Sequence, residues 1–168
     1  PLFLADTTVN VNPSAEDLVE ITLLVAQTIG KMKIVPKIAL LSYSNFGSAG
    51  GEDANKVAKA VSILHRDHPK MVVDGEVQAN FALNGEMLRE NFPFSRLKDM
   101  KVNTLIFPNL AAGNIAYKLL QEIAGLEATG PVLLGMKKSY HILQMGCSVR
   151  EIINMVRIAV VDAQLKSN

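Results

Sequence analysis

The 168-residue sequence contains one cysteine, no tryptophan and only 5% aromatic residues. The single cysteine, Cys147, excludes an internal disulfide framework and predicts a reducing, cytoplasmic environment. No apolar run approaches the roughly 20 residues that a membrane-spanning helix needs. Lysine and arginine are scattered, and the net charge of +1 gives no electrostatic reason to expect binding to nucleic acid or to a membrane surface.

Apolar residues, in contrast, make up 49% of the chain, and charged residues make up 20%. This composition and this length are typical of one well-buried α/β domain. The chain begins at Pro1 and enters an expected strand at once, without a signal-peptide pattern. We interpret this start as a cut piece of a longer protein.

Segments that fit strands alternate with segments that fit helices, which predicts a mostly parallel sheet with helices on its faces. Strands are expected at 3–5, 38–41, 71–73, 104–107 and 132–134. Helices are expected at about 15–30, 54–64, 84–90, 114–123 and 149–163. Capping-box spacing opens the first helix at Ser14 and Asp17, and the last helix at Ser148 and Glu151.

The last two expected helices carry apolar residues at helical spacing, which predicts buried faces. The residues expected to point inward are Ile115, Leu119, Leu120 and Ile123 in the first of them, and Val149, Ile152, Ile153, Val156, Ala159, Val160 and Ala163 in the second. Met155, Ile158 and Val161 fall outside that stripe. Because a helix that is apolar on more than one face needs a second partner, we expect a homodimer whose contact surface is formed by helices of this chain.

The loop SYSNFGSAGGED lies between a strand and a helix, at the carboxyl end of the strand. Ligands of open α/β sheets bind at that edge, and helix N-terminal amides attract anions. One interpretation is that its polar groups bind a phosphate or a pantetheine amide; the candidates are Ser42, Ser44, Asn45, Gly47 and Ser48. The other is an ordinary glycine-rich turn with Asp53 as a cap. No Gly-Lys-Ser/Thr ends the loop, so it is not a P-loop.

Other candidates stand alone. His65 and His68 are three residues apart but lack the further ligands of a metal site, and we expect no metal and no catalytic histidine, His141 included. Cys147 precedes a helix, where a thiol pKa is lowered, yet a small residue for close packing explains it as well. Glu151 is either a catalytic carboxylate or only the capping-box acid.

Five colinear motifs give the strongest indication of function. They are LADTTVNVNPSAEDLVEI, ALLSYSNFGSA, VVDGEVQANFAL, NTLIFPNLAAGNIAYKLLQ and TGPVLLGMKKSYHILQMGCSVREI. Together they resemble the phosphate acetyl/butyryltransferase family over nearly the whole chain. The resemblance implies a three-layer α/β/α sandwich of the isopropylmalate-dehydrogenase-like type, with a cleft between two domains.

The resemblance also implies how the chain is organised. It makes the chain a single fragment (1–168), the C-terminal half of a family member, with a second subdomain over about 1–135 and a returning segment and helix over about 136–168. A ligand cleft would then be bordered by the SYSNFGS loop, Asn114 and the start of the last helix. The expected contributors at that helix start are Gln144, Met145, Gly146, Cys147, Ser148 and Glu151.

Within these motifs several charged residues of the family are replaced. Phe46 and Met145 stand where the family has Lys and Arg, and Gln144 replaces a serine. Asn80 and Asn109 replace acids, and Leu134 replaces a glutamine. Because transfer to or from phosphate needs a cation for the developing charge, we expect little acyltransferase activity.

These departures look like the transferase-like C-terminal domain of bacterial NADP-dependent malic enzymes. The resemblance implies a regulatory and oligomerisation domain with acetyl-CoA or a related CoA ester as effector and no cofactor of its own. NADP and Mg or Mn would belong to an N-terminal malic-enzyme domain in cis, which oxidatively decarboxylates malate to pyruvate. The alternatives are an active phosphate acyltransferase and a purely structural dimerisation module.

Overall fold

The computed structural model describes residues 1–125 and 128–166, apart from the side chain of Leu165. The chain forms two compact units, Pro1–Tyr117 (unit 1) and Lys118–Asn168 (unit 2). The division falls inside helix α5 (Leu110–Ile123). The subdomain boundary expected near residue 135 stays a prediction.

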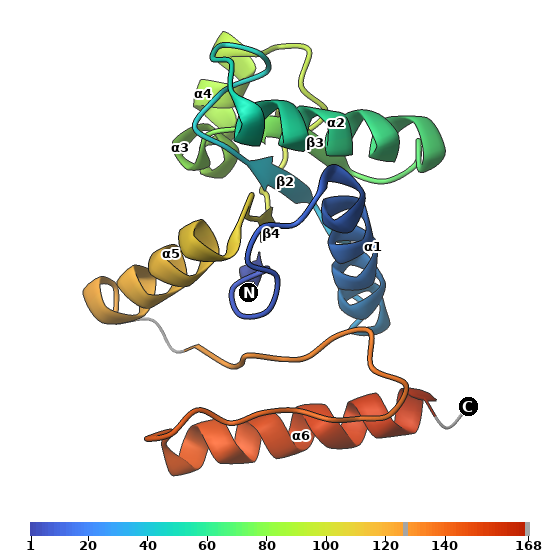
Figure 1. Cartoon of the computed structure of the whole chain (residues 1–168), viewed down its shortest axis with the longest axis vertical. Coiled ribbons are helices and arrows are strands. Elements are labelled where there is room, and N and C mark those ends of the chain that lie inside the picture. Colours follow the sequence, from blue (N-terminus) through green and yellow to red (C-terminus); the bar gives the residue numbers. More distant parts are fainter. Residues whose placement is uncertain (126–127, 167–168) are drawn as a thin grey trace. The chain divides into compact units, whose positions relative to one another are not determined.

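Unit 1 is built on a four-stranded sheet with the strand order β1-β4-β2-β3 (Figure 1). Its strands are β1 (Phe3–Ala5), β2 (Ile38–Leu41), β3 (Val73–Val77) and β4 (Thr104–Ile106). All three pairings between neighbouring strands are parallel. The predicted α/β class and parallel sheet are confirmed.

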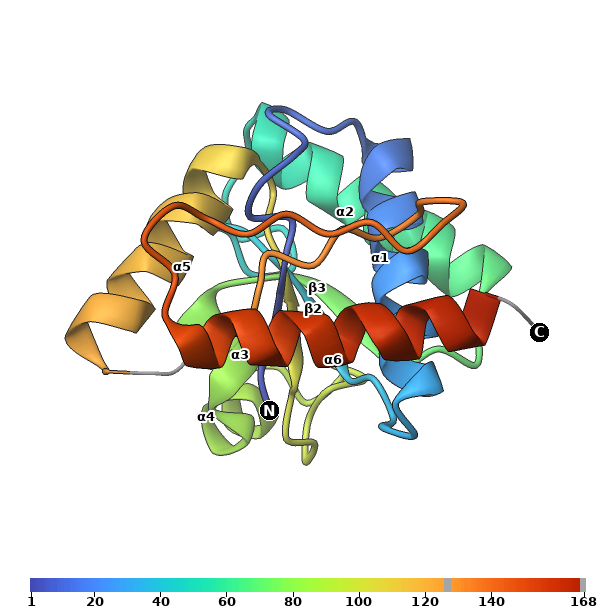
Figure 2. The same cartoon turned by 90° about the horizontal axis from the view of Figure 1, so that it is seen from below.

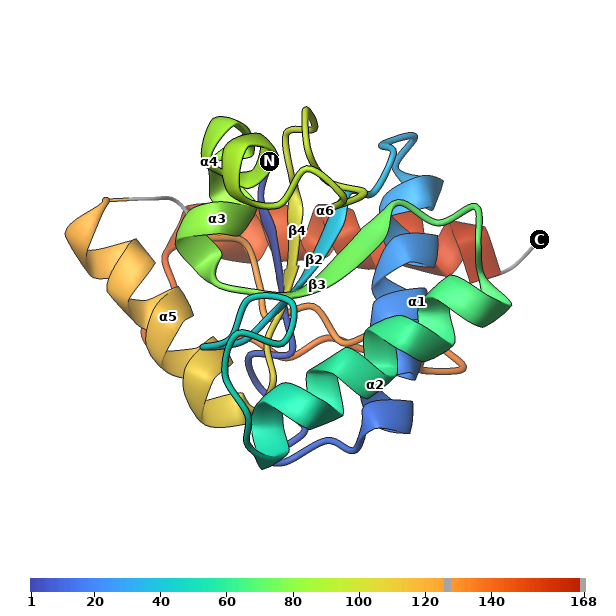
Figure 3. The ribbon, with the colours of Figure 1, turned by 90° about the horizontal axis from the view of Figure 1, so that it is seen from above.

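Helices cover both faces of this sheet, as Figure 3 shows for unit 1. The helices of unit 1, besides the start of α5, are α1 (Ala15–Lys31), α2 (Glu52–Asp67), α3 (Ala79–Leu83) and α4 (Gly85–Asn91). Alternate residues of a strand point to opposite faces. Ala39 and Leu41 of β2 pack in one core cluster with Ala82 of α3 and Leu88 of α4. Helices α1 and α2 pack on each other at the other face (Figure 3), which completes three layers in this unit.

Helix α1 begins where the sequence predicts. The Asp17 amide donates to Ser14 Oγ at 3.1 Å, and the Ser14 amide donates to Asp17 Oδ2 at 2.8 Å. This capping box satisfies two N-terminal amides that have no partner within the helix. Leu18 of the first turns is buried in the core.

Two predicted boundaries are wrong because polar residues have partners that the sequence does not reveal. Strand β3 continues through Asp74 and Glu76, which were expected to end it; both carboxylates are buried. Asp74 Oδ2 accepts hydrogen bonds from the Ser95 hydroxyl at 2.9 Å and the Arg96 amide at 2.7 Å. Helix α5 starts at Leu110 rather than 114, because Asn109 Oδ1 accepts from the Ala112 amide at 2.9 Å.

Unit 2 contains helix α6 (Val149–Lys166), whose capping box is confirmed. The Ser148 amide donates to Glu151 Oε2 at 2.6 Å, and the Glu151 amide donates to Ser148 Oγ at 3.2 Å. The segment before it doubles back along α6 (Figures 1 and 2), where the Ser139 hydroxyl donates to the Ala159 carbonyl at 2.9 Å.

The strand expected at 132–134 is wrong. These residues are half-buried but have no strand assignment. Pro131 lacks the amide hydrogen that a sheet ladder uses, and Gly130 and Gly135 on either side adopt positive φ angles of 146° and 77°. The apolar run therefore forms irregular chain.

The expected inward faces of the last two helices are also wrong for the described chain. In α5, Ile115 is 59% exposed and Ile123 is 81% exposed. In α6 the exposed residues of the expected stripe are Val149, Ile152, Ile153, Val156, Val160 and Ala163, whereas Met155, placed outside it, is buried. Periodicity fixes which residues share a face but not what covers that face. No helix in the described part of the chain is both long and apolar enough to cross a membrane.

Candidate functional site

The loop that follows β2 is held by a buried carboxylate from the neighbouring strand. Glu76 of β3 is buried, and its Oε1 accepts from the Ser44 hydroxyl at 2.9 Å and the Gly47 amide at 2.6 Å. Ser44 has no exposed surface, and its Oγ also accepts from the Ala49 amide at 3.0 Å. The Ser44 hydroxyl is therefore used to shape the loop.

The other polar residues of the loop also form hydrogen bonds with neighbouring groups of the protein. Asn45 Oδ1 accepts from the Gln78 amide at 2.8 Å, and the Asn45 amide donates to Ser48 Oγ at 2.8 Å. Ser42 Oγ accepts from the Ser44 amide at 3.3 Å. These contacts fit a self-bonded turn better than a ligand cradle, although ligand binding by Ser42, Ser44, Asn45, Gly47 and Ser48 stays a prediction. The cap position of α2 is Gly51, not Asp53, which pairs with Lys56 at 2.8 Å.

Phe46, at the position of the family's lysine, belongs to an aromatic cluster. Its ring centroid lies 5.0 Å from that of Phe92 and 5.1 Å from that of Phe94, and Phe81 lies 5.2 Å from Phe92. The segment that contains Phe92 and Phe94 thus packs on the loop. Position 46 contributes packing rather than charge.

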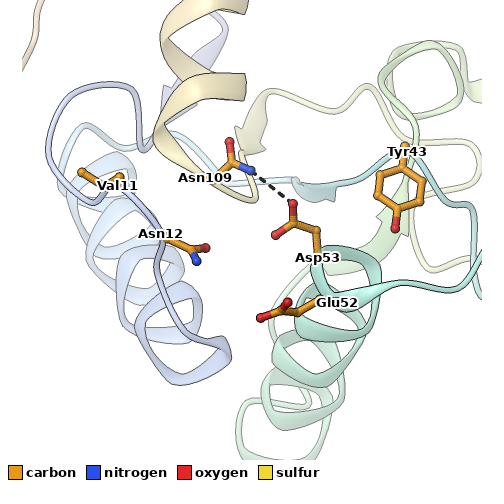
Figure 4. Close-up of a pocket in the computed structure, with 6 residues that line it drawn as sticks. All are labelled: Val11, Asn12, Tyr43, Glu52, Asp53 and Asn109. Carbon is orange, nitrogen blue, oxygen red and sulfur yellow. Dashed lines mark hydrogen bonds between the residues drawn. The ribbon is translucent and has the colours of Figure 1, made fainter.

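A hollow of about 440 Å³ lies at the carboxyl ends of the strands in unit 1 (Figure 4). It is lined by Val11, Asn12, Tyr43, Glu52, Asp53 and Asn109. The Asn109 amide group donates to Asp53 Oδ2 at 3.3 Å, and Lys56 Nζ donates to Asn12 Oδ1 at 2.8 Å. Two carboxylates line this hollow, and Lys56 already pairs with one of them, so the arrangement does not favour a phosphate.

Sequence reasoning missed this hollow, although Asn12, Tyr43 and Asn109 all follow strands whose carboxyl ends share one edge. Asn114, which was predicted at the ligand cleft, does not line it; its Nδ2 donates to the Thr7 carbonyl at 3.1 Å. Asp6 orders the loop that carries Val11. Burial raises the Asp6 pKa, but hydrogen bonds from the amides of Thr8, Asn10 and Val9 bring that pKa below its ordinary value of 3.8.

A second hollow, of about 240 Å³, lies within unit 2. It is lined by Lys118, Gln121, Glu122, Gly130, Leu143, Gln144, Met145, Gly146, Cys147, Glu151 and Met155. Five of the six residues predicted at the start of the last helix are in this set, and Ser148 serves as the helix cap instead. Lys118 Nζ donates to Gln144 Oε1 at 3.0 Å. Sequence reasoning missed Lys118, which brings a cation close to the position where Met145 lacks one.

Glu151 has a structural task at this hollow. Hydrogen bonds from the Ser148 amide and hydroxyl outweigh burial and, with the charge of Lys118, lower the Glu151 pKa from its ordinary value of 4.5. Its carboxylate therefore stays ionised at neutral pH and accepts at the helix start. These contacts favour the capping interpretation over the catalytic one. Cys147 lines the hollow and is partly exposed.

Each of the three histidines contacts another group of the protein. His65 Nε2 lies 2.9 Å from the Val73 carbonyl oxygen, and the His68 amide caps the end of α2 on Leu64. His141 is not alone, because its Nε2 lies 3.5 Å from Asp162 Oδ2 of α6. Among residues 1–125 and 128–166, no group of three or more histidine, cysteine, aspartate or glutamate side chains is placed to hold a metal ion.

Comparisons with known proteins agree with the motifs. The profile of the phosphate acetyl/butaryl transferase family matches residues 1–160. An NADP-dependent malic enzyme of Haemophilus influenzae is 45% identical over 163 residues, which are 97% of this chain and 21% of that protein. A phosphate acetyltransferase of Clostridium acetobutylicum is 41% identical over 164 residues, which are 97% of this chain and 49% of that protein.

Solved structures give the same result. A phosphotransacetylase from Streptococcus pyogenes superposes with a TM-score of 0.86 at 34% identity, covering 97% of this chain and 48% of that one. The EutD phosphotransacetylase from Staphylococcus aureus gives a TM-score of 0.86 at 31% identity, covering 96% and 49%. The chain thus spans about half the length of these three transferases, and about a fifth of the malic enzyme.

Proposed function

Because this chain belongs to the phosphate acetyl/butaryl transferase family, we propose that it is a regulatory domain without acyltransferase activity, which binds a coenzyme A ester. In this proposal it forms the C-terminal part of a cytoplasmic NADP-dependent malic enzyme, and acetyl-CoA is its effector. Malate, NADP and Mg or Mn are bound by an N-terminal domain in cis.

One observation carries the proposal: neither of the two positions at which the family has a cation holds a charged side chain in this protein. Phe46 lies in an aromatic cluster, and Met145 is exposed at the rim of the unit 2 hollow. Removing a single donor to a developing negative charge typically costs about 10²–10³ in rate. Two such losses leave a domain that can bind an acyl-CoA but scarcely transfer its acyl group to phosphate.

The relatives support the malic-enzyme context. The match to a protein named NADP-dependent malic enzyme includes 97% of this chain but only 21% of that protein. A domain occupying a fifth of a malic enzyme leaves the rest of that chain for malate and nicotinamide chemistry.

The test is a pair of measurements on the full-length protein that contains this chain. Acetyl phosphate formation from acetyl-CoA and inorganic phosphate should stay at background, while acetyl-CoA should bind by calorimetry and inhibit malate oxidation. Turnover at the level of an ordinary phosphotransacetylase would instead establish the alternative, an active acyltransferase. That alternative draws its support from Lys118 at the unit 2 hollow and from the 41% identity to a phosphate acetyltransferase.

Exposed apolar residues on α5 and α6 favour assembly as a further part of the function. Ile123, Val149 and Val156 are each more than half exposed. Covering such residues by a second copy stabilises a dimer by roughly 25 cal/mol per Å² of apolar surface removed from water. Light scattering at micromolar concentration should give twice the monomer mass. A dimer that binds no acetyl-CoA would leave the structural dimerisation module as the function.

A further inference from the structure

Two methionines line the unit 2 hollow, and they differ in how far solvent reaches them. Met145 is fully exposed, whereas Met155 of α6 is only 5% exposed. The chain has seven methionines, and the next most exposed are Met32 at 45% and Met136 at 44%. Met145 is therefore the methionine whose side chain is most open to a small molecule in solution.

The chemistry available to this exposed side chain is that of a thioether. A thioether reacts with hydroperoxides, whereas a guanidinium, which the family has at position 145, does not. The sulfur attacks one peroxide oxygen, so that an S–O bond forms and the O–O bond breaks. With hydrogen peroxide, the proton of the transferred oxygen passes to the departing hydroxide, which leaves as water. The sulfur loses two electrons, the peroxide gains them, and the product is methionine sulfoxide.

The two positions differ in whether the folded protein tolerates this product. A sulfoxide converts a flexible apolar side chain into a polar one. At Met145 the new oxygen lies in water, and no packing is lost. At Met155 the oxygen would need a partner in a buried place, because burial of an unpaired polar group costs free energy. The fold therefore permits oxidation at Met145 and opposes it at Met155.

We propose that Met145 is a site of reversible oxidation by hydroperoxides, modified before the other methionines of the folded protein. A thiol-dependent methionine sulfoxide reductase returns it to the thioether, because the exposure that admits the peroxide also admits the reductase. Oxidation adds a strongly polar S=O group to a hollow that Lys118, Glu122 and Glu151 also line. This inference goes beyond the proposed function and does not depend on it.

The test is peptide mass spectrometry after brief treatment of the full-length protein with hydrogen peroxide. Trypsin releases Met145 and Cys147 in the peptide 139–150, Met155 in 151–157 and Met136 in 119–137. One added oxygen should appear on Met145 first, on Met136 more slowly, and on Met155 only after long exposure to peroxide. The same treatment in concentrated urea should make the three rates equal. The ratio of the rate in urea to the rate in buffer should be close to one for Met145 and largest for Met155.

Two variants and one recovery step complete the experiment. Met145→Leu should lose the modification that appears first, whereas Met136→Leu, at the matched exposed position in the same unit, should keep it. Protein that is oxidised at Met145 alone should have an unchanged urea midpoint. Incubation of this protein with a methionine sulfoxide reductase and dithiothreitol should restore the unmodified peptide 139–150.

Several results would overturn the inference. One is a Met145 that reacts as slowly in the folded protein as Met155 does, because the side chain would then be covered. Another is oxidation of Cys147 ahead of Met145, which would make the thiol the target in this hollow. A lowered urea midpoint at the stage where only Met145 carries oxygen, or a sulfoxide that the reductase leaves in place, would also contradict it.

Discussion

The two polar regions of the molecule differ in what their hydrogen-bonding groups face. In the loop after β2, the Ser44 hydroxyl and the Gly47 amide both donate to buried Glu76. In unit 2, Gln144 Oε1 accepts from Lys118 Nζ at 3.0 Å, and Gln144 is one of the residues that line the hollow. The carboxylate and the hydroxyl that hold the first region are buried, whereas Gln144 of the second is exposed to solvent. Loss of a hydrogen-bonding group should therefore cost more stability in the first region than in the second.

The largest effect of this difference on stability should come from Glu76→Ala. This change leaves the buried Ser44 hydroxyl and the Gly47 amide without an acceptor, at about 1–3 kcal/mol for each group. We expect the free energy of unfolding to fall by about 3 kcal/mol in urea denaturation. Gln144→Ala should change it by less than about 0.5 kcal/mol, as is usual for an exposed site. Equal losses in the two variants would contradict the comparison.

A smaller loss of stability is expected when Phe46→Lys restores the lysine that the family has at this position. The change removes two aromatic contacts worth about 0.5–1.5 kcal/mol each, so stability should fall by about 2 kcal/mol. Acetyl phosphate formation should stay at background, because Met145 still provides no charge. Phe94→Lys, at a side chain that is 68% exposed, is the control and should cost less. A gain of transferase activity in Phe46→Lys would show that this position alone silences the site.

The two capping boxes allow a matched comparison between the units. Ser14→Ala and Ser148→Ala each remove one cap, which is worth about 1 kcal/mol to its helix. Because α1 is packed in the core, Ser14→Ala should lower the global unfolding free energy. Ser148→Ala should instead speed amide hydrogen exchange near 149–152 and hardly alter global unfolding, since most of α6 is exposed. Matching global losses would show that α6 is part of the same cooperative unit as the sheet.

The smallest expected effect is on the stability of the fold at acidic pH. The Asp6 pKa is lowered in the folded state, so the carboxylate contributes stability that is fully present above its unfolded pKa near 3.8. That contribution is lost as the pH falls through the lower folded pKa. Asp6→Asn should therefore flatten the decline of stability below about pH 4 in denaturation series. An unchanged decline would assign acid sensitivity to other carboxylates.

Much of the fold follows from local sequence, and the failures have a common cause. The strands 3–5 and 38–41 and both capping boxes were predictable because their signals lie within a few residues. Strand β3 was misplaced because the partners of Asp74 and Glu76 come from distant segments, such as Ser44 on the preceding loop. The two charged residues indicated the end of a strand, but their buried hydrogen-bond partners allow the strand to continue through them.

The same limit applies to the candidate site. The residues 144–147 and Glu151 were predicted together through the family motif, and the unit 2 hollow does group them. Lys118 could not be predicted as their neighbour, because it lies 26 residues from Gln144 and only folding brings the two together. Nor could the motif show that position 46 would turn to Phe92 rather than to the solvent.

The strand order has a consequence for biosynthesis. Among the described residues strand β1 lies at an edge of the sheet and pairs with β4, so the partner of Phe3, Thr104, is synthesised much later than Phe3 itself. At about 5–20 residues per second, this delay lasts roughly 5–20 s. During that interval the pairing between β1 and β4 cannot form, so this part of the sheet is completed late in synthesis.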